Sequence, residues 1–185
     1  MKKWIPWVIG VIALAAFVGL IGWARAYVSP LTPRASEAWS RGRLLGSTPI
    51  NVRIDAQYGP EGDVYLAWGG IDKQLHVARV GDRGQLWMSR KPEFDSTVAQ
   101  EPQLLLGPGG EIHLVWLDTA GRYSTLTYAR LDQSAHVLTS PYALSLEGDF
   151  AQRPLIAFNR QGDVEVFWVG RAGVYHAGVS AQGEK

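Results

Sequence analysis

The chain has 185 residues, no cysteine, and a formal net charge of +1 at pH 7. This length fits one domain with a real core, and the lack of cysteine excludes a disulfide framework, a thiolate nucleophile and a cysteine metal site. From residue 27 onward, 15 basic residues stand against 17 acidic ones, a balance that argues against a nucleic-acid partner.

The first predicted element is a transmembrane helix. Trp4 to Ala24 contains no charged residue over 21 positions, and about 20 apolar helical residues cross a bilayer core. Lys2 and Lys3 precede this run and place the N-terminus in the cytoplasm. Aromatic rings that favour the membrane interface lie near its two ends: Trp4, Trp7, Trp23 and Tyr27. We therefore expect a single-pass protein of a bacterial-type cell membrane, with its C-terminal domain periplasmic or extracellular.

Two further features belong to this anchor, assigned to residues 1–27. Ala15 and Gly19 form a small-x-x-x-small pair that allows close packing with another helix. The alternative is a cleaved signal peptide, because Ala24-Arg25-Ala26 has the form of a cleavage site, but the apolar run exceeds the usual length of about 7 to 15 residues. Residues 28–42, which contain Pro30 and Pro33, are predicted to be a short linker.

Residues 43–185 contain a repeat that predicts the fold. Its landmark is a glycine, an acidic residue, four strand-like positions and a tryptophan. The three copies run from Gly62 to Trp68, from Gly110 to Trp116 and from Gly162 to Trp168. A second landmark follows each tryptophan and aligns three alanines: Ala78, Ala129 and Ala177. A third precedes the glycine, where Ala99-Gln100-Glu101-Pro102 matches Ala151-Gln152-Arg153-Pro154.

Each repeat is predicted to form one blade of short strands. Repeated four-stranded units of about 40 to 50 residues are typical of β-propellers. We expect blades over residues 50–91, 101–140 and 153–180, the third lacking its outermost strand. Residues 43–48 are the predicted replacement for that strand. The fold class is therefore all-β, with three propeller-like blades after one transmembrane helix, as a partial or strand-shared propeller.

The pattern D-x-x-G-x-x-H-x-x-W, clearest in "GPGGEIHLVWLD", resembles the blades of sialidase-like, or BNR-type, β-propeller proteins. The resemblance covers residues 43 to 180 and implies a propeller architecture. A sialidase would also need an arginine cluster, for which Arg53 and Arg153 occupy suitable places. No copy contains the Asp-box S-x-D-x-G-x-T-W of that family.

No other catalytic or metal motif emerges. The four histidines have no carboxylate at a metal-like spacing, and Asp63, Glu111 and Asp163 suit turns, so no metal and no cofactor are expected. Because they recur at one strand position, Trp68, Trp116 and Trp168 are predicted to pack between blades together with the three aligned alanines. The repeat constrains Trp39 and Trp87 less, and these are the candidates for partner contacts.

The function favoured by these features is a non-catalytic membrane-anchored subunit that offers a docking surface in a membrane protein complex. Its partners would be the membrane and either other subunits or a second copy of the chain, because three blades do not close a ring. The alternatives are a surface glycan-binding module with pockets between blades, and a sialidase-type glycosidase completed by dimerisation.

Overall fold

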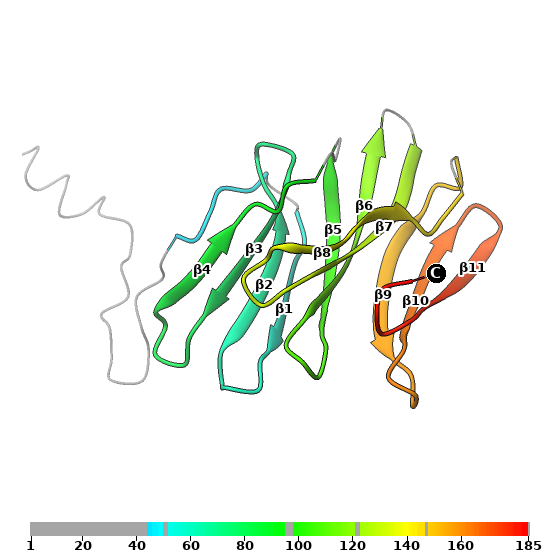
Figure 1. The fold of residues 1–185 in the computed structure, drawn as a ribbon. Coiled ribbons are helices and arrows are strands. Elements are labelled where there is room, and N and C mark those ends of the chain that lie inside the picture. The colour runs from blue at the N-terminus through cyan, green and yellow to red at the C-terminus, as the bar shows by residue number, and fades with distance from the viewer. Residues whose placement is uncertain (1–43, 50–51, 95–97, 121–122, 147, 185) are drawn as a thin grey trace, which may run out of the picture. The chain divides into compact units, whose positions relative to one another are not determined.

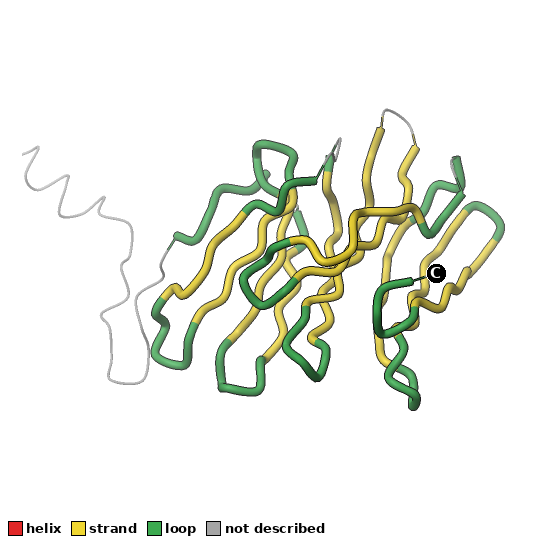
Figure 2. Tube along the Cα trace, in the orientation of Figure 1, coloured by secondary structure: helices red, strands yellow, loops and turns green. Residues whose placement is uncertain are grey.

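The computed structural model describes residues 44–49, 52–94, 98–120, 123–146 and 148–184, all within the compact unit Leu44–Lys185. These residues form strands, turns and loops, with no helix among them (Figures 1 and 2). The all-β prediction for this part of the chain is confirmed.

The strands form three antiparallel sheets, which we call blades 1 to 3 in chain order. Blade 1 consists of β1 (Ile54–Tyr58), β2 (Val64–Gly69), β3 (Leu75–Val80) and β4 (Leu86–Arg90). Blade 2 consists of β5 (Ala99–Leu106), β6 (Ile112–Ala120), β7 (Tyr123–Leu131) and β8 (Val137–Ala143). Blade 3 consists of β9 (Gln152–Phe158), β10 (Val164–Gly170) and β11 (Gly173–Val179). Within each sheet the strands follow sequence order, so the first strand of each blade occupies one edge.

The landmark glycines lie in the turn between the first two strands of each blade. Gly62, Gly110 and Gly162 have φ angles of 79°, 81° and 89°, in the left-handed region that glycine tolerates without steric cost. The N–H of each donates to a carbonyl oxygen three residues earlier, as in a β-turn. The glycine therefore recurs because the same tight hairpin is built three times.

Blade 2 is buried on both faces, because successive side chains of a strand point to opposite sides of a sheet. Trp116 lies in the hydrophobic cluster shared with blade 1, where it stacks on Phe94 with ring centroids 5.1 Å apart. Val115 and Leu117 lie in the second cluster, together with Ile156 and other residues of blade 3. The tryptophan face of one blade thus packs on the opposite face of the blade before it.

The first strands of the three blades are neighbours. β5 contacts β1 on one side and β9 on the other, so these strands line the inner edge of the blade array (Figure 1). Asp55 Oδ2 of β1 accepts the Leu104 N–H of β5 at 2.7 Å, and Asp118 Oδ1 of β6 accepts the N–H of Val98 at 3.2 Å. The first bond links β5 to β1, and the second holds the residue before β5 against β6.

Residues 44–49 do not become the fourth strand of blade 3. Ser47 accepts the backbone N–H of Ile71 at 3.1 Å, and the Thr48 hydroxyl donates to the carbonyl of Gly69 at 2.8 Å. The segment lies beside blade 1, where Gly46 leaves room for the Trp68 ring. The strand predicted to complete blade 3 from residues 43–48 is therefore wrong.

The predicted transmembrane run, with Ala15 and Gly19, lies outside the described residues. Within the part of the chain that the structure does describe, no helix has the length and apolarity to span a bilayer. The anchor stays a prediction.

Candidate functional site

The three blades place a charged residue at one equivalent position of the inner edge. Arg53, Glu101 and Arg153 each precede the landmark glycine by nine residues. They stand just before β1, near the start of β5 and near the start of β9, respectively. We call these three residues the inner-edge trio.

Two members of the trio have an unusual backbone. Glu101 has φ 45° and Arg153 has φ 51°, both in the left-handed region that costs roughly 1–2 kcal/mol for a residue with a side chain. Each is followed by a proline, which already disfavours the right-handed helical region. The strand pairing shifts register beside both residues. One shift lies between Gln100 and Gln103 in β5, and the other lies between Phe167 and Val169 of β10, which pairs with β9. A bulge of this kind re-aims side chains and is frequent beside functional sites.

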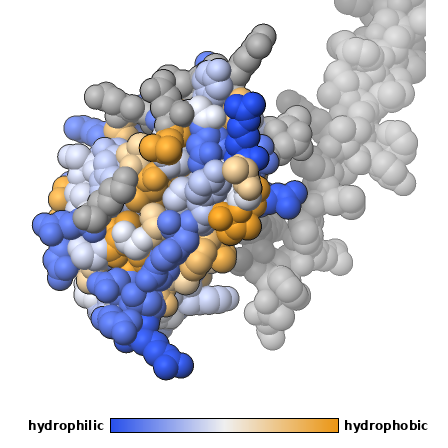
Figure 3. Space-filling view, turned by 90° about the vertical axis from the view of Figure 1, so that its right-hand side faces the viewer, coloured by the Kyte–Doolittle hydropathy of each residue, from blue (hydrophilic) through white to orange (hydrophobic). Residues whose placement is uncertain are grey.

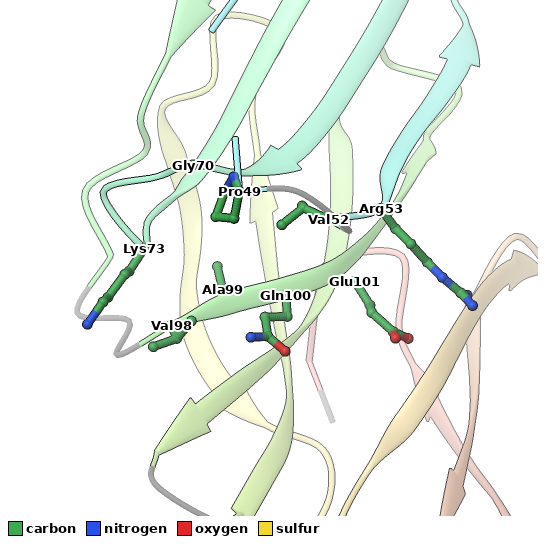
Figure 4. Close-up of a pocket in the computed structure, with 9 residues that line it drawn as sticks. All are labelled: Pro49, Val52, Arg53, Gly70, Lys73, Val98, Ala99, Gln100 and Glu101. Atoms are coloured by element: carbon green, nitrogen blue, oxygen red, sulfur yellow. The ribbon is translucent and has the colours of Figure 1, made fainter. Parts of the chain in front are cut away.

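The trio is connected across the blades. Glu101 Oε2 accepts the backbone N–H of Arg153 at 3.2 Å. Arg53 and Glu101 line the same pocket, and their side chains extend to the same side of it (Figure 4). Glu101 therefore joins the pocket to blade 3.

The pocket lies between blades 1 and 2 and encloses about 270 Å³. Its lining consists of Pro49, Val52, Arg53, Gly70, Lys73, Val98, Ala99, Gln100 and Glu101. The Lys73 side chain points away from Arg53 and Glu101, whereas the Gln100 amide lies between them and Lys73 (Figure 4). Guanidinium, amide and carboxylate groups side by side can bind hydroxyl groups, and the guanidinium also suits an anion. No aromatic ring is among these lining residues.

A second polar cluster is enclosed between blades 2 and 3. His113 is fully buried, and its Nδ1 lies 2.7 Å from the Tyr128 hydroxyl. Burial lowers the pKa of His113 to about 4 and raises the pKa of Tyr128, so both are neutral near pH 7. Nε2 of His113 is 3.8 Å from Glu111 Oε1 and has no hydrogen-bond partner. The His113 and Tyr128 side chains are therefore closed to solvent.

The remaining histidines form pairs with carboxylates. His76 pairs with Asp72 at 2.9 Å, His136 pairs with Asp132 at 3.0 Å, and His176 pairs with Glu165. No three His, Cys, Asp or Glu residues among those described are arranged to hold a metal ion.

The structure places the other predicted residues as follows. Trp68, Trp116 and Trp168 are 5%, 1% and 5% exposed. Trp116 and Trp168 lie on the face that packs on the preceding blade, as predicted, whereas Trp68, in the first blade, is covered by the segment that contains Gly46. Ala78 and Ala129 are fully buried, and Ala177 packs against the cluster of blades 2 and 3. Trp87 is 45% exposed, and the Arg79 guanidinium lies 4.7 Å from its ring centroid. Trp39 and the aromatic residues of the predicted anchor lie outside the described residues.

No protein-family model matches the sequence, and no curated protein does. Several solved structures are similar to this chain. An α-L-arabinofuranosidase from Fusarium graminearum superposes with a TM-score of 0.54 at 10% identity, over 75% of this chain and 49% of that protein. A putative exo-β-1,3-galactanase from Bifidobacterium bifidum has a TM-score of 0.52 at 12% identity, over 71% and 49%. A protein of unknown function from Dyadobacter fermentans has a TM-score of 0.54 at 15% identity, over 69% and 37%.

These likenesses establish a β-propeller-like fold. The chain spans less than half the length of the three proteins, and the low identities carry the fold alone. The propeller prediction is confirmed at this level, whereas the sialidase-like type is not singled out. The non-catalytic membrane subunit receives no support.

The expectation that the chain is not an enzyme needs correction. It rested on missing motifs, but the fold is shared with proteins described as an arabinofuranosidase, a galactanase and an endo-arabinase. A propeller site is assembled from several strands, so a missing linear motif does not exclude catalysis.

Sequence analysis singled out Arg53 and Arg153 but missed Glu101. The signal was present in the repeat alignment, because counting nine residues back from each landmark glycine gives all three positions. What the alignment did not supply was the adjacency of β1, β5 and β9, which places equivalent positions at the same end of the inner edge.

Proposed function

We propose that this chain recognises carbohydrate at the inner edge of its blades, with an acid-bearing saccharide as the preferred ligand. The observation that carries the proposal is the inner-edge trio: one charged residue at the same repeat position in each of three adjacent blades. The glycosidase descriptions of the structural neighbours support a carbohydrate ligand.

The chemistry of the trio suits a sugar with a carboxylate. An arginine guanidinium binds a carboxylate with two parallel hydrogen bonds, and the trio offers two arginines. Glu101 accepts hydrogen bonds from hydroxyl groups and already accepts one from the Arg153 backbone. Two guanidinium groups against one carboxylate give the trio a net positive charge, which favours an acidic ligand over a neutral one.

The pocket is small. Its volume of about 270 Å³ lies just below the range of roughly 300–1,000 Å³ typical of ligand sites. This size fits one terminal sugar unit better than the middle of a chain. The absence of an aromatic ring in the lining means that polar contacts, rather than stacking, would provide the affinity.

Glycoside hydrolysis is the second candidate, favoured by the presence of Glu101 at the site. Most glycosidases use two carboxyl groups, about 5–5.5 Å apart in retaining enzymes and about 6.5–9.5 Å apart in inverting ones. Glu101 supplies one carboxyl group. An assay for hydrolysis therefore belongs beside every binding measurement.

The test uses the full chain and a panel of oligosaccharides, half of them ending in a uronic acid and half in the matching neutral sugar. Binding is measured by calorimetry, and released reducing sugar is measured in the same samples. We expect acid-ended ligands to bind at least tenfold more tightly than their neutral partners. Arg53→Gln and Arg153→Gln should each remove most of that preference.

The matched control is Arg83→Gln, which changes an exposed arginine in the turn between β3 and β4. It should leave binding unchanged. No binding of any saccharide at millimolar concentration, or equal loss of affinity in the control, would overturn the proposal. Turnover of a bound saccharide that disappears in Glu101→Gln would identify the site as catalytic.

A further inference from the structure

The outer face of blade 3 is an apolar surface without a covering blade among the described residues. Phe167 pairs with Leu155 on one side and His176 on the other, and Val169 pairs with Val174, so these five side chains share one face. Leu155, Phe167, Val169 and Val174 are 56%, 37%, 39% and 78% exposed. Figure 3 views the molecule from the side of blade 3 and shows apolar patches between polar residues. We call this surface the blade 3 end face.

The same positions are buried in the other two blades. Val174 of blade 3 occupies the position of Leu126 in blade 2 and of Leu75 in blade 1. Their cross-strand partners are Val169, Leu117 and Gly69, respectively. Leu75 and Leu126 are 1% and 0% exposed, inside the two clusters between blades. Blade 3 therefore presents a face that the fold buries wherever another blade follows.

The polar residues of this face also have a buried counterpart. Glu165 bonds to His176 at the two positions that His113 and Tyr128 occupy in blade 2. In blade 2 that pair is covered by blade 3, where the His113 ring lies 5.6 Å from the Phe158 ring. A satisfied polar pair at this position is thus compatible with a covering blade.

Blade 1 presents the complementary face. Its side that carries Trp68 also carries Ile54 and Tyr58, which pair with Trp68 and Val64 and are 59% and 84% exposed. Tyr58 precedes its landmark glycine by four residues, as Leu106 and Phe158 do. Leu106 and Phe158 pack in the clusters between blades. The segment that contains Gly46 covers the Trp68 ring, so the open part of this surface, which we call the blade 1 end face, consists of Ile54 and Tyr58. Blades 1 and 2 bind the equivalent positions of the blades that follow them.

We propose that the blade 3 end face binds the blade 1 end face of a second copy of this chain, head to tail. The occupant follows from the two interfaces inside the molecule, in which the face equivalent to the blade 3 end face always receives a tryptophan-bearing face. The contact between His113 and Phe158 specifies the register: Glu165 of one copy lies against Tyr58 of the next. Two copies that pair at both ends close a ring of six blades, within the usual range of four to eight, and an open geometry gives a chain of copies.

The experiment uses the absence of cysteine from the sequence. Full-length Glu165→Cys and Tyr58→Cys proteins are purified separately, mixed, and treated with a short bis-maleimide reagent. We expect a covalent dimer in the mixture and little in either protein alone. The matched control replaces Tyr58→Cys with Tyr123→Cys, since Tyr123 is exposed on β7 away from both end faces. Equal cross-linking with the control, or a dimer formed by Glu165→Cys alone, would overturn the head-to-tail arrangement.

A second measurement keeps the proposal independent of cross-linking. Sedimentation of the full chain should give a dimer or larger species at micromolar concentration, and Val174→Glu should shift it to monomer, weakening association at least tenfold. Val174 is largely exposed, so this change leaves the fold intact, as circular dichroism will verify. Val137→Glu, on exposed β8, is the control and should not alter the mass. A monomeric wild-type chain, or an assembly unaffected by Val174→Glu, would refute the proposal.

Discussion

The His113 imidazole and the Tyr128 hydroxyl form a hydrogen bond of 2.7 Å inside the interface between blades 2 and 3. Both side chains are fully buried, so neither can exchange this bond for one to water. The pair lies among apolar residues of both blades, where a polar group without a hydrogen-bond partner would destabilise the packing.

Tyr128→Phe should therefore destabilise the protein. The change removes the hydroxyl and leaves His113 Nδ1 buried without a partner, at a cost of about 1–3 kcal/mol in the free energy of unfolding. Denaturant titration monitored by tryptophan fluorescence measures this difference. Tyr123→Phe, at an exposed position, is the control and should stay within about 0.5 kcal/mol of wild type. Equal stabilities of the two variants would contradict the role of the pair.

The low pKa of His113 makes stability depend on pH. The pKa of about 4 in the folded protein lies below the ordinary value of 6.5, so the unfolded chain binds the proton more strongly. The stability that neutral His113 contributes is present above pH 6.5 and is lost as the pH falls toward 4. The full loss is about 3 kcal/mol, which corresponds to about 2.5 pH units at 1.36 kcal/mol each.

This pH dependence is isolated by comparing wild type with His113→Gln between pH 7.5 and pH 4.5. Burial raises the pKa values of carboxylates such as Asp72 and Asp132, but hydrogen bonds from backbone and histidine groups lower them overall. These carboxylates titrate in both proteins, so their contributions to the unfolding free energy cancel in the difference. The unfolding free energy of wild type should fall by about 2–3 kcal/mol more than that of the variant. If the unfolding free energies of the two proteins change equally with pH, His113 does not cause the pH dependence.

The two kinds of tryptophan should respond differently to truncation. Trp116→Ala removes a ring that is 1% exposed and stacked on Phe94, and should cost about 3–5 kcal/mol. Trp87→Ala removes a half-exposed ring and one contact with the Arg79 guanidinium, and should cost about 1 kcal/mol or less. Thermal unfolding of both variants checks the contrast. A loss at Trp87 as large as that at Trp116 would show that Trp87 belongs to the core.

The repeat predicted the fold because each landmark has a local physical cause. The glycine marks a turn that needs positive φ, and the tryptophan marks the face that packs on the preceding blade. The strand predicted over residues 43–48 had no such local cause. The place of these residues before blade 1 matches that of the last strand of one repeat before the next and so predicted a strand, but hydrogen bonds to Gly69 and Ile71 hold the segment beside blade 1.

The candidate site was less predictable than the fold. Arg53 and Arg153 were noticed through a family resemblance, whereas Glu101 required knowledge of which strands are adjacent. Its left-handed backbone also had no sequence signal, because residue propensities do not assign positive φ to a glutamate before a proline. Which end face a neighbour covers is likewise a tertiary property, and it is invisible in the alternation of a single strand.

The positive φ at Glu101 yields a prediction in which the usual order of alanine and glycine is reversed. At an ordinary strand position glycine is about 0.5–1 kcal/mol less stable than alanine, because it loses more conformational freedom on folding. At φ 45° a Cβ atom is strained, so Glu101→Gly should be about 1 kcal/mol more stable than Glu101→Ala. Both variants lose the carboxylate, so the comparison isolates the backbone.

The matched pair is Arg53→Gly and Arg53→Ala, at the equivalent position of blade 1, where positive φ is not found. There alanine should be the more stable residue. Chemical denaturation of the four proteins measures their free energies of unfolding. If alanine is more stable than glycine at both positions, the backbone of Glu101 is not strained.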